Sequence, residues 1–469
     1  MNTIRNINKG EQKMKKTIIT MVTAALLSSC GLYRSYERPS DIQTDSLYRS
    51  DRTLPGDSAG IGTLNWREVF TDPQLQKLIE KGLAQNTDML SAQLTIEQAE
   101  ASLKAAKWAY IPSLTFTPSG TFAAYDWDKA TKTYEIPVTA SWQLDLFGSL
   151  HNAKKGAQAQ LANSQAYKQA VQSSLVAAIA NYYYSLAMLK DQLQISIETE
   201  QSWRENVRIT RALMEAGQSN LAAVSQTEAN YYSICTNITD LKQEISGLED
   251  EFSALLGETP QKYPIGTLEQ FNTPKTISAG VPLIALANRP DVKQAETNLA
   301  VAYYATNEAR SAFYPAITIA ASLGWTNDLG TVIKNPGEWL WSAIGSLTQP
   351  LFQNGQLRAQ YKISKAQQEQ AKLSFQQTLL DAGVEVNAAL TKIDATTEKE
   401  TLYAKQVEAL EKAVESTQQL MINSSTNYLE VLTAQQSLLS AQLTQVSNKF
   451  EEVQAVIELY QALGGGYEE

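Results

Sequence analysis

The sequence contains the same plan twice, so its fold must use that plan twice. Asp88 lies in LAQNTDMLSAQ and Asp291 lies in LANRPDVKQAE, which are separated by 203 residues (291 − 88). The motif LFG of the first copy returns as LFQNG from Leu351, and Val224 matches Val431 at an offset of 207 (431 − 224). Solenoid repeats have periods of only about 20 to 50 residues. Each copy is therefore a whole structural half with a helix-strand-strand-helix plan.

The N-terminus resembles a bacterial lipoprotein signal. A basic segment begins at Met14 with the letters MKK, an apolar run covers residues 17–27, and the letters LSSC end at Cys30. The apolar run is too short to cross a bilayer as a helix. We expect residues 1–29 to be removed and Cys30 to become the acylated first residue of the mature chain. An ordinary signal peptide with a chance cysteine is the alternative, and translation from Met14 would shorten the leader.

Charge and cysteine content exclude several classes of protein. Removing residues 1–29 takes away five basic residues and one acidic residue, so the formal charge falls from −10 to −14 (34 − 48). A nucleic-acid partner is not expected, because such binding depends on positive charge. The only cysteine besides Cys30 is Cys235, so no intramolecular disulfide is predicted. No later segment holds 18 consecutive apolar residues, so any membrane crossing is expected to use strands.

Alternation of apolar and polar side chains predicts one β-hairpin in each copy. The predicted strands cover residues 113–125 and 134–147 in the first copy, and residues 316–326 and 338–351 in the second. Each is close to the roughly 9 to 11 residues of a tilted transmembrane strand. Aromatic residues lie near the strand ends, as in the interfacial girdle of a membrane barrel; they are Trp127, Tyr134, Trp142, Trp325, Trp339 and Trp341.

Four strands are too few for a closed barrel. The smallest transmembrane barrels have about eight strands, and an open sheet edge is not tolerated in lipid. Several chains are therefore expected to share one barrel. The alternative is a soluble protein in which the apolar strand faces pack on a core.

Between the hairpins the sequence predicts very long helices. Residues 150–215 contain no proline and only one glycine, Gly156, and residues 356–423 contain only Gly383. A single helix of either length would reach roughly 100 Å, and heptad-like spacing of apolar residues indicates coiled-coil packing. Turn signals at residues 216–220 and 423–427 precede a returning helix in each copy. The predicted fold is mainly α with a small β part, and each copy forms one tall helical hairpin.

These features predict the following division of the chain: a signal peptide at 1–29, a lipidated extended segment at 30–72, a first repeat at 73–257, a connector at 258–285, a second repeat at 286–464 and a tail at 465–469.

The motifs in this order resemble the TolC-like outer-membrane efflux family, and in particular its lipoprotein branch that serves resistance-nodulation-division pumps. The motifs are YERP after the cysteine, WREVFTDPQLQKLIEKGLAQNTD, AYIPSLT and FYPAITI before strands, WQLDLFG and LTQPLF after them, NYLEVLTAQQSLLSAQ and ELYQALGGGY. The resemblance implies a lipid-anchored homotrimer in the outer membrane, whose four strands per chain form a twelve-stranded barrel. It also implies a hollow helical barrel that meets a periplasmic adaptor and an inner-membrane pump, with no cofactor.

The resemblance also indicates where a gate is expected. Members of the family often carry LDAQR after the second turn, and three such acids would form an anionic ring in the pore. Here the stretch reads LTAQQ, so Thr433 replaces the acid and Gln436 replaces the basic residue. Glu430, one turn nearer the tip, is the candidate for a displaced ring. The alternative is that Glu430 is a solvated surface group.

Three other functions compete with a drug or bile-salt exit duct. An enzyme is not expected, because His151 is the only histidine and the chain has no CxxC motif or Gly-rich phosphate loop. A periplasmic adaptor lipoprotein would have one helical hairpin, where this sequence predicts two. An exit duct for type I secretion or metal-ion efflux would share the fold, although seven methionines and one histidine give no sign of a metal-rich tract.

Overall fold

The computed structural model describes residues 33–40, 42, 65–124, 130–271, 289–326, 338–422 and 428–465. The predicted signal peptide, Cys30, Trp127 and the second turn at 423–427 lie outside the described residues. The chain divides into two compact units, each described by itself. Unit 1 draws on residues 1–42, 95–165 and 294–376, and unit 2 on residues 43–94, 166–293 and 377–469. The units do not coincide with the predicted repeats, because each unit takes residues from both copies.

The helices of the two copies match in length, which confirms the mainly α fold and the two helical hairpins. The first pair has 22 residues each, the second 67 and the third 35. Their starts are offset by 203 residues for the first pair (290 − 87) and by 207 for the others (356 − 149 and 428 − 221). The pairs are α4 (Thr87–Trp108) with α8 (Pro290–Ser311), α5 (Ser149–Glu215) with α9 (Gln356–Ile422), and α6 (Leu221–Leu255) with α10 (Tyr428–Ala462). Over the described ranges, no helix combines the length and the hydropathy that a membrane crossing requires.

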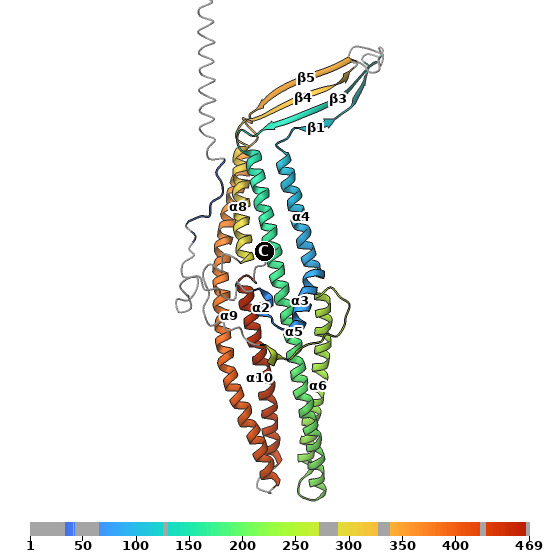
Figure 1. Ribbon diagram of the computed structural model, residues 1–469, viewed down its shortest axis with the longest axis vertical. Helices are drawn as coiled ribbons and strands as arrows, with labels where there is room; N and C mark the ends of the chain where they lie inside the picture. The colour runs from blue at the N-terminus through green and yellow to red at the C-terminus, as the bar shows by residue number, and fades with distance from the viewer. Residues whose placement is uncertain are drawn as a thin grey trace, which may run out of the picture. The chain divides into compact units, whose positions relative to one another are not determined.

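One antiparallel sheet forms in unit 1, beyond the ends of the helices of that unit (Figure 1). Its strands are β1 (Ser113–Phe116), β2 (Ser119–Ala123), β3 (Thr131–Leu144), β4 (Ala316–Thr326) and β5 (Glu338–Thr348). The order across the sheet is β1-β3-β4-β5. Strand β2 follows β1 along the same edge and pairs with the first part of β3. The central pair, β3 with β4, joins one strand of each copy from Glu135 opposite Thr326 to Leu144 opposite Ile317.

The strand boundaries differ from the sequence prediction in three places. The strand predicted at 113–125 is interrupted at Pro118, because proline has no N–H to donate to the neighbouring strand. The strand predicted at 134–147 runs three residues earlier, and the strand predicted at 338–351 ends at Thr348, before Pro350. The strand predicted at 316–326 has the bounds of β4.

The sheet has no hydrophobic core of its own within the described residues. Its apolar side chains are exposed, with Leu114 at 75%, Phe122 at 70% and Trp341 at 77%. The two central strands approach closely at Gly324, where an added Cβ would lie 2.3 Å from the carbonyl oxygen of Ile136. Exposed apolar surface of this kind marks a membrane or a partner interface.

The core of unit 2 joins short N-terminal helices to the long ones. The short helices are α2 (Trp66–Val69) and α3 (Pro73–Gln85), and the side chains of Trp66, Phe70 and Ile79 are fully buried. The ring of Phe70 meets the ring of Tyr460 on α10 edge to face at 5.5 Å. Burial of each large apolar side chain stabilises the fold by about 1.5–3 kcal/mol, so this cluster fixes the base of the hairpins.

Candidate functional site

The two candidate gate residues lie on the first two turns of α10, in unit 2. Glu430 is in the first turn, where a negative charge interacts favourably with the helix dipole. The Thr433 hydroxyl donates a hydrogen bond of 2.9 Å to the carbonyl oxygen of Leu429. Both side chains are exposed, and their spacing of three places them on one helix face. The structure therefore brings Glu430 and Thr433 together on one exposed stripe of α10.

Packing on the opposite side of α10 fixes the direction of this stripe. Leu432 and Leu439 form a buried cluster with Trp203 of α5 and Ile234 of α6. Rotating α10 to turn the stripe inward would bury the Glu430 carboxylate, and taking a charged group out of water costs several kcal/mol. The apolar cluster thus holds the candidate residues at the surface of the chain.

Uncharged hydrogen bonds also connect α10 to the first hairpin. The amide nitrogen of Asn206 on α5 donates to the side-chain oxygen of Gln435 at 2.7 Å, and Gln435 is buried. Further from the tip, Gln192 donates to the hydroxyl of Ser447 at 3.0 Å. Neither link depends on a titrating group. Local sequence patterns do not predict these links, since Asn206 and Gln435 are 229 positions apart.

A groove of about 640 Å³ lies beside these contacts, between α5, α9 and α10. Glu198 and Glu205 of α5, Met421 of α9 and Gln435 of α10 are among its lining residues. Glu430 and Thr433 are not among them. The exposed stripe and the groove are therefore separate surfaces of unit 2.

The turn of the first hairpin has a defined geometry. Gly217 follows α5 with φ at 74°, and the amide of Gln218 donates to the carbonyl of Leu213 at 2.8 Å, which closes the helix end. Asn220 caps α6, and its side chain accepts from the Ala223 amide at 3.0 Å. Position 223 is the counterpart of Glu430 (430 − 207). Only the second copy therefore carries an acid at this level.

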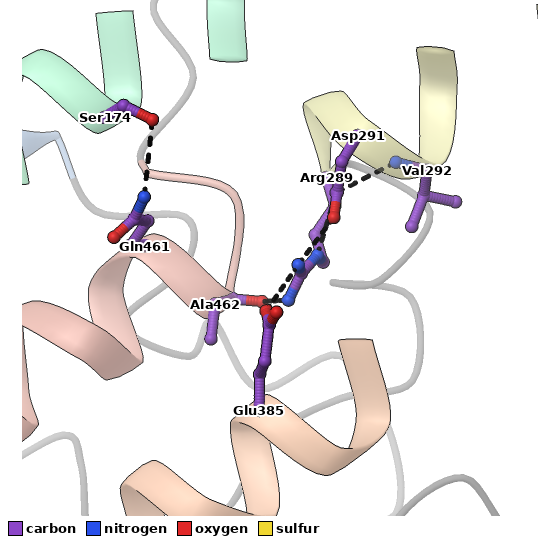
Figure 2. A network of polar contacts seen from close by, with 7 residues as sticks. All are labelled: Ser174, Arg289, Asp291, Val292, Glu385, Gln461 and Ala462. Atoms are coloured by element: carbon purple, nitrogen blue, oxygen red, sulfur yellow. Dashed lines mark hydrogen bonds and ion pairs between the residues drawn. The ribbon is translucent and has the colours of Figure 1, made fainter. Parts of the chain in front are cut away.

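A second polar network lies at the other end of α10 (Figure 2). Arg289 is buried and donates to the Ala462 carbonyl oxygen at 2.7 Å. It also forms ion pairs with Asp291 at 2.6 Å and with Glu385 of α9 at 2.7 Å. Burial opposes the Arg289 charge, but these two partners outweigh it and raise its pKa. Arg289 thereby ties the start of α8 to α9 and to the end of α10.

Asn86 makes the equivalent contact in the first copy. Its side-chain nitrogen donates to the carbonyl of Leu255, at the end of α6, at 2.9 Å. Its side-chain oxygen accepts from the amide of Asp88 at 2.8 Å and so caps α4. Alignment of the two copies places Asn86 opposite Arg289 (289 − 86 = 203). That alignment is the signal by which sequence analysis could have found both residues.

The N-terminal segment 33–40 docks along unit 1. The Tyr33 hydroxyl donates to the carbonyl of Asp145, directly after β3, at 2.7 Å. The Tyr36 amide donates to the hydroxyl of Tyr304 on α8 at 3.1 Å. Arg38 forms an ion pair with Glu296 of α8. Tyr33 is three positions after Cys30 (33 − 30), so the predicted acylation site is close in sequence to this docked segment.

His151 lies in the first turn of α5. It is half-buried, and its ring lies 5.1 Å from the ring of Tyr33. Burial lowers the pKa of His151, and the adjacent Lys155 acts in the same direction. Its backbone amide donates to the Asp145 carboxylate at 2.7 Å, which caps the start of α5. The only histidine of the chain is therefore part of a helix cap.

The chain is similar to one protein family and, among known proteins, to the three relatives described next. The model of the family described as outer membrane efflux protein matches residues 78–258 and 281–465. The cation efflux system protein CusC of Escherichia coli O6:H1 is 26% identical over 96% of this chain and 99% of its own. A solved structure of CusC, which concerns folding and transmembrane channel formation, superimposes with a TM-score of 0.80 over 92% of this chain and 99% of that one, at 26% identity. The probable outer membrane lipoprotein SilC of Salmonella typhimurium is 25% identical over 97% of this chain and 100% of its own. The toluene efflux pump outer membrane protein TtgC of Pseudomonas putida is 26% identical over 97% of each chain.

Proposed function

The chain belongs to the outer membrane efflux protein family, and we propose that it is the trimeric exit duct of a tripartite efflux system. Membership confirms the resemblance to TolC-like efflux proteins that the motifs indicated, and it identifies the chain as an outer-membrane efflux protein. In the proposed system an inner-membrane resistance-nodulation-division pump supplies the cargo, and a periplasmic adaptor joins pump and duct.

The observation that carries this proposal is the incomplete sheet of unit 1. Because β1 and β2 both pair with the same edge of β3, the five strands fill only four positions across the sheet. A sheet of four positions, with its apolar side chains exposed, cannot close into a barrel within one chain. Three chains would supply twelve positions, which exceeds the roughly eight strands of the smallest membrane barrels. Closure would pair the edge strands β1 and β2 of one chain with β5 of the next, and would leave no unpaired backbone groups in lipid.

The duct is proposed to be passive and to have no catalytic activity. Its contribution is a path and a gate, and the pump supplies the driving force. We assign the gate to the tip of the hairpins, where Glu430 and Thr433 share the exposed stripe of α10. Three copies of Glu430 would make one anionic ring, because the first copy has Ala223 at the same level.

Lipid attachment at Cys30 completes the proposed membrane association. The relative SilC is named as a lipoprotein, and the LSSC pattern supports the same modification here. Docking of Tyr33 beside the end of β3 would hold the acyl chains near the level at which the sheet enters the membrane.

The proposed cargo is a small organic molecule such as a drug or a bile salt. Metal-ion efflux is the second candidate, since CusC is named as part of a cation efflux system. TtgC is named for toluene and is equally similar to this chain. Because the pump selects the cargo, relatives with different cargo can share one kind of duct.

Deletion of the gene, with complementation, tests the function and separates the two cargoes. The proposal predicts increased sensitivity to antibiotics and bile salts, restored by the wild-type gene. Increased sensitivity to transition-metal salts alone would favour the second candidate. Unchanged sensitivity to all of these compounds, with the protein present in the outer membrane, would contradict a role in efflux.

Single-channel recording tests the proposed gate. Glu430→Gln should reduce the preference for cations, and Thr433→Asp should increase it, because each changes the charge of a ring of three residues. Ala223→Ser alters the matched position of the first copy without adding charge and is the control. An unchanged cation preference in Glu430→Gln would exclude Glu430 as the ring.

A further inference from the structure

Basic residues lie in sequence near the ends of α4, α5, α8 and α9 that adjoin the sheet of unit 1. Figure 1 shows these helix ends beside the strands. The helices α4 and α8 end at that side, and α5 and α9 begin there. Since a helix rises about 1.5 Å per residue, every member of this group lies within roughly 15 Å of the nearest helix end. The members, called the basic collar, are Lys104, Lys107, Lys154, Lys155, Arg310, Arg358, Lys362 and Lys365.

The collar is positive in a protein that is acidic. The segments 101–112, 145–160, 305–316 and 349–366 contain these eight basic residues and only two acidic ones, a net charge of +6 (8 − 2). The whole chain has a formal charge of −10, so the rest carries −16 (−10 − 6). Such a local excess produces a positive potential that attracts anions.

The collar charges are not neutralised within the part of the chain that the structure describes. Six of the eight side chains are exposed, and Lys154 and Lys155 are half-buried. None forms an ion pair with a described residue, whereas exposed lysines elsewhere, such as Lys412 with Glu408 at 2.6 Å, do so. On α9 the collar residues are spaced by four and three positions, which places them on one helix face.

Exposed apolar and aromatic side chains lie between the collar and the sheet. Trp108, the last residue of α4, is 65% exposed, and Ile111, between α4 and β1, is 61% exposed. Leu351 and Phe352, between β5 and α9, are 93% and 83% exposed. The ammonium group of Lys104 lies 5.8 Å from the Trp108 ring centroid, so the two layers are in contact. The order of apolar strand, aromatic layer and cations is that of a protein crossing the hydrocarbon, the interface and the head groups of a bilayer.

We propose that the basic collar binds the phosphate groups of anionic phospholipids in the membrane leaflet on the helix side of the sheet. This inference rests on the proposed function, because it requires the sheet to cross a membrane. Lysine and arginine beside an anionic membrane surface are attracted to it over about one Debye length, roughly 8 Å at physiological ionic strength. The collar would fix the depth of the channel in the bilayer and enrich anionic lipid around it.

Quenching of tryptophan fluorescence by brominated lipids measures this preference. The purified full-length oligomer is reconstituted in phosphatidylcholine vesicles that contain increasing brominated phosphatidylglycerol, and the ratio of the two lipid binding constants is determined. We expect a preference for phosphatidylglycerol of about fivefold or more, since each cation near an anionic surface contributes on that scale. High salt should abolish the preference, because screening then acts over about 3 Å.

Variants that remove positive charges identify the residues responsible for the preference for phosphatidylglycerol. Arg358→Gln/Lys362→Gln/Lys365→Gln and, independently, Lys104→Gln/Lys107→Gln should lower the ratio by at least half. Lys242→Gln/Lys262→Gln/Lys405→Gln is the control, because it removes three exposed cations of unit 2 that have no ion pair with a described residue. A wild-type ratio of one, or an equal loss in the control variant, would overturn the inference. So would a preference that inorganic phosphate abolishes and sodium chloride of equal ionic strength does not, since a soluble anion would then be the ligand.

Conductance in pure phosphatidylcholine bilayers separates this inference from the proposed function. Channels without a lipid preference would reject the collar and retain the exit duct. An oligomer that forms no channels in any lipid would reject both.

Discussion

The guanidinium of Arg289 donates a 2.7 Å hydrogen bond to the carbonyl oxygen of Ala462, so the residue before the second repeat's first helix binds the end of its last helix. The first repeat closes the same junction with an amide, through Asn86 and Leu255. The donors are 203 residues apart (289 − 86) and the acceptors 207 (462 − 255). In both repeats a side chain thus donates a hydrogen bond to the last carbonyl group of the closing helix. The donor is a neutral amide in the first repeat and a charged guanidinium in the second.

Removal of the Arg289 side chain should destabilise the second repeat. Arg289→Ala leaves the Ala462 carbonyl without this donor, and we expect the free energy of unfolding to fall by about 1.5–3 kcal/mol, the scale for hydrogen bonds to charged groups. Asp291 and Glu385 are about half exposed and regain water, which limits the loss. Chemical unfolding in detergent measures it. Arg208→Ala, which breaks an exposed ion pair with Glu205, should have no measurable effect.

Exchanging the amide and guanidinium donors tests whether the Asn86–Leu255 and Arg289–Ala462 contacts are equivalent. Arg289→Asn keeps a shorter hydrogen-bond donor, so it should lower the free energy of unfolding less than Arg289→Ala. Asn86→Arg should lower the free energy of unfolding more than Asn86→Ala. The position that matches Glu385 is Ala178 (385 − 207), so the buried cation would have only Asp88, the counterpart of Asp291, as a matched acid. Adding Ala178→Glu to Asn86→Arg should restore part of the stability. Equal stability with and without the added glutamate would refute the equivalence.

The link between Asn206 and Gln435 is expected to hold the tip closed. Asn206→Ala leaves the buried Gln435 oxygen without this donor, at a cost of about 1–3 kcal/mol. We expect longer open times in single-channel recording, and the effect should not change with ionic strength, since both groups are uncharged. Gln436→Ala, on the exposed side of α10, is the control. Open times that respond equally to both substitutions would show that this bond is not the restraint.

Tyr36 predicts an alkaline limit for docking of the N-terminal segment. Burial, followed by the charge of Glu296, raises the pKa of Tyr36 from 10.0 to about 12. A phenol with a higher pKa in the docked state stabilises docking fully below pH 10, and this contribution is lost as the pH rises through about 12. Proteolysis of the segment should therefore accelerate over that range. In Tyr36→Phe this part of the pH dependence should vanish without loss of docking at neutral pH, since the hydroxyl has no hydrogen-bond partner in the described structure. Acceleration that persists in Tyr36→Phe would assign it to another group.

The sequence predicts the large elements well because their signals are local. Long stretches with almost no glycine or proline specify α5 and α9, and the duplication specifies that their lengths agree. The break at Pro118 could also have been read locally, since proline interrupts strand pairing. The strands were recognisable from alternation, although their ends were displaced by up to three residues.

Contacts between distant segments could not be predicted in the same way. The bond from Asn206 to Gln435 depends on how α5 and α10 are rotated, and no short-range pattern records that rotation. Docking of Tyr33 on Asp145 joins residues 112 positions apart. The basic collar is visible only after the helix ends are known, because its members come from four separate segments.

Electrical recording of the purified full-length protein in a planar bilayer tests the exit-duct function most directly. We expect discrete conductance steps from the oligomer and none after heating has separated the chains, because the four strand positions of one chain cannot close a barrel. A stable, membrane-inserted oligomer that conducts no ions, or conductance steps from separated single chains, would contradict that function.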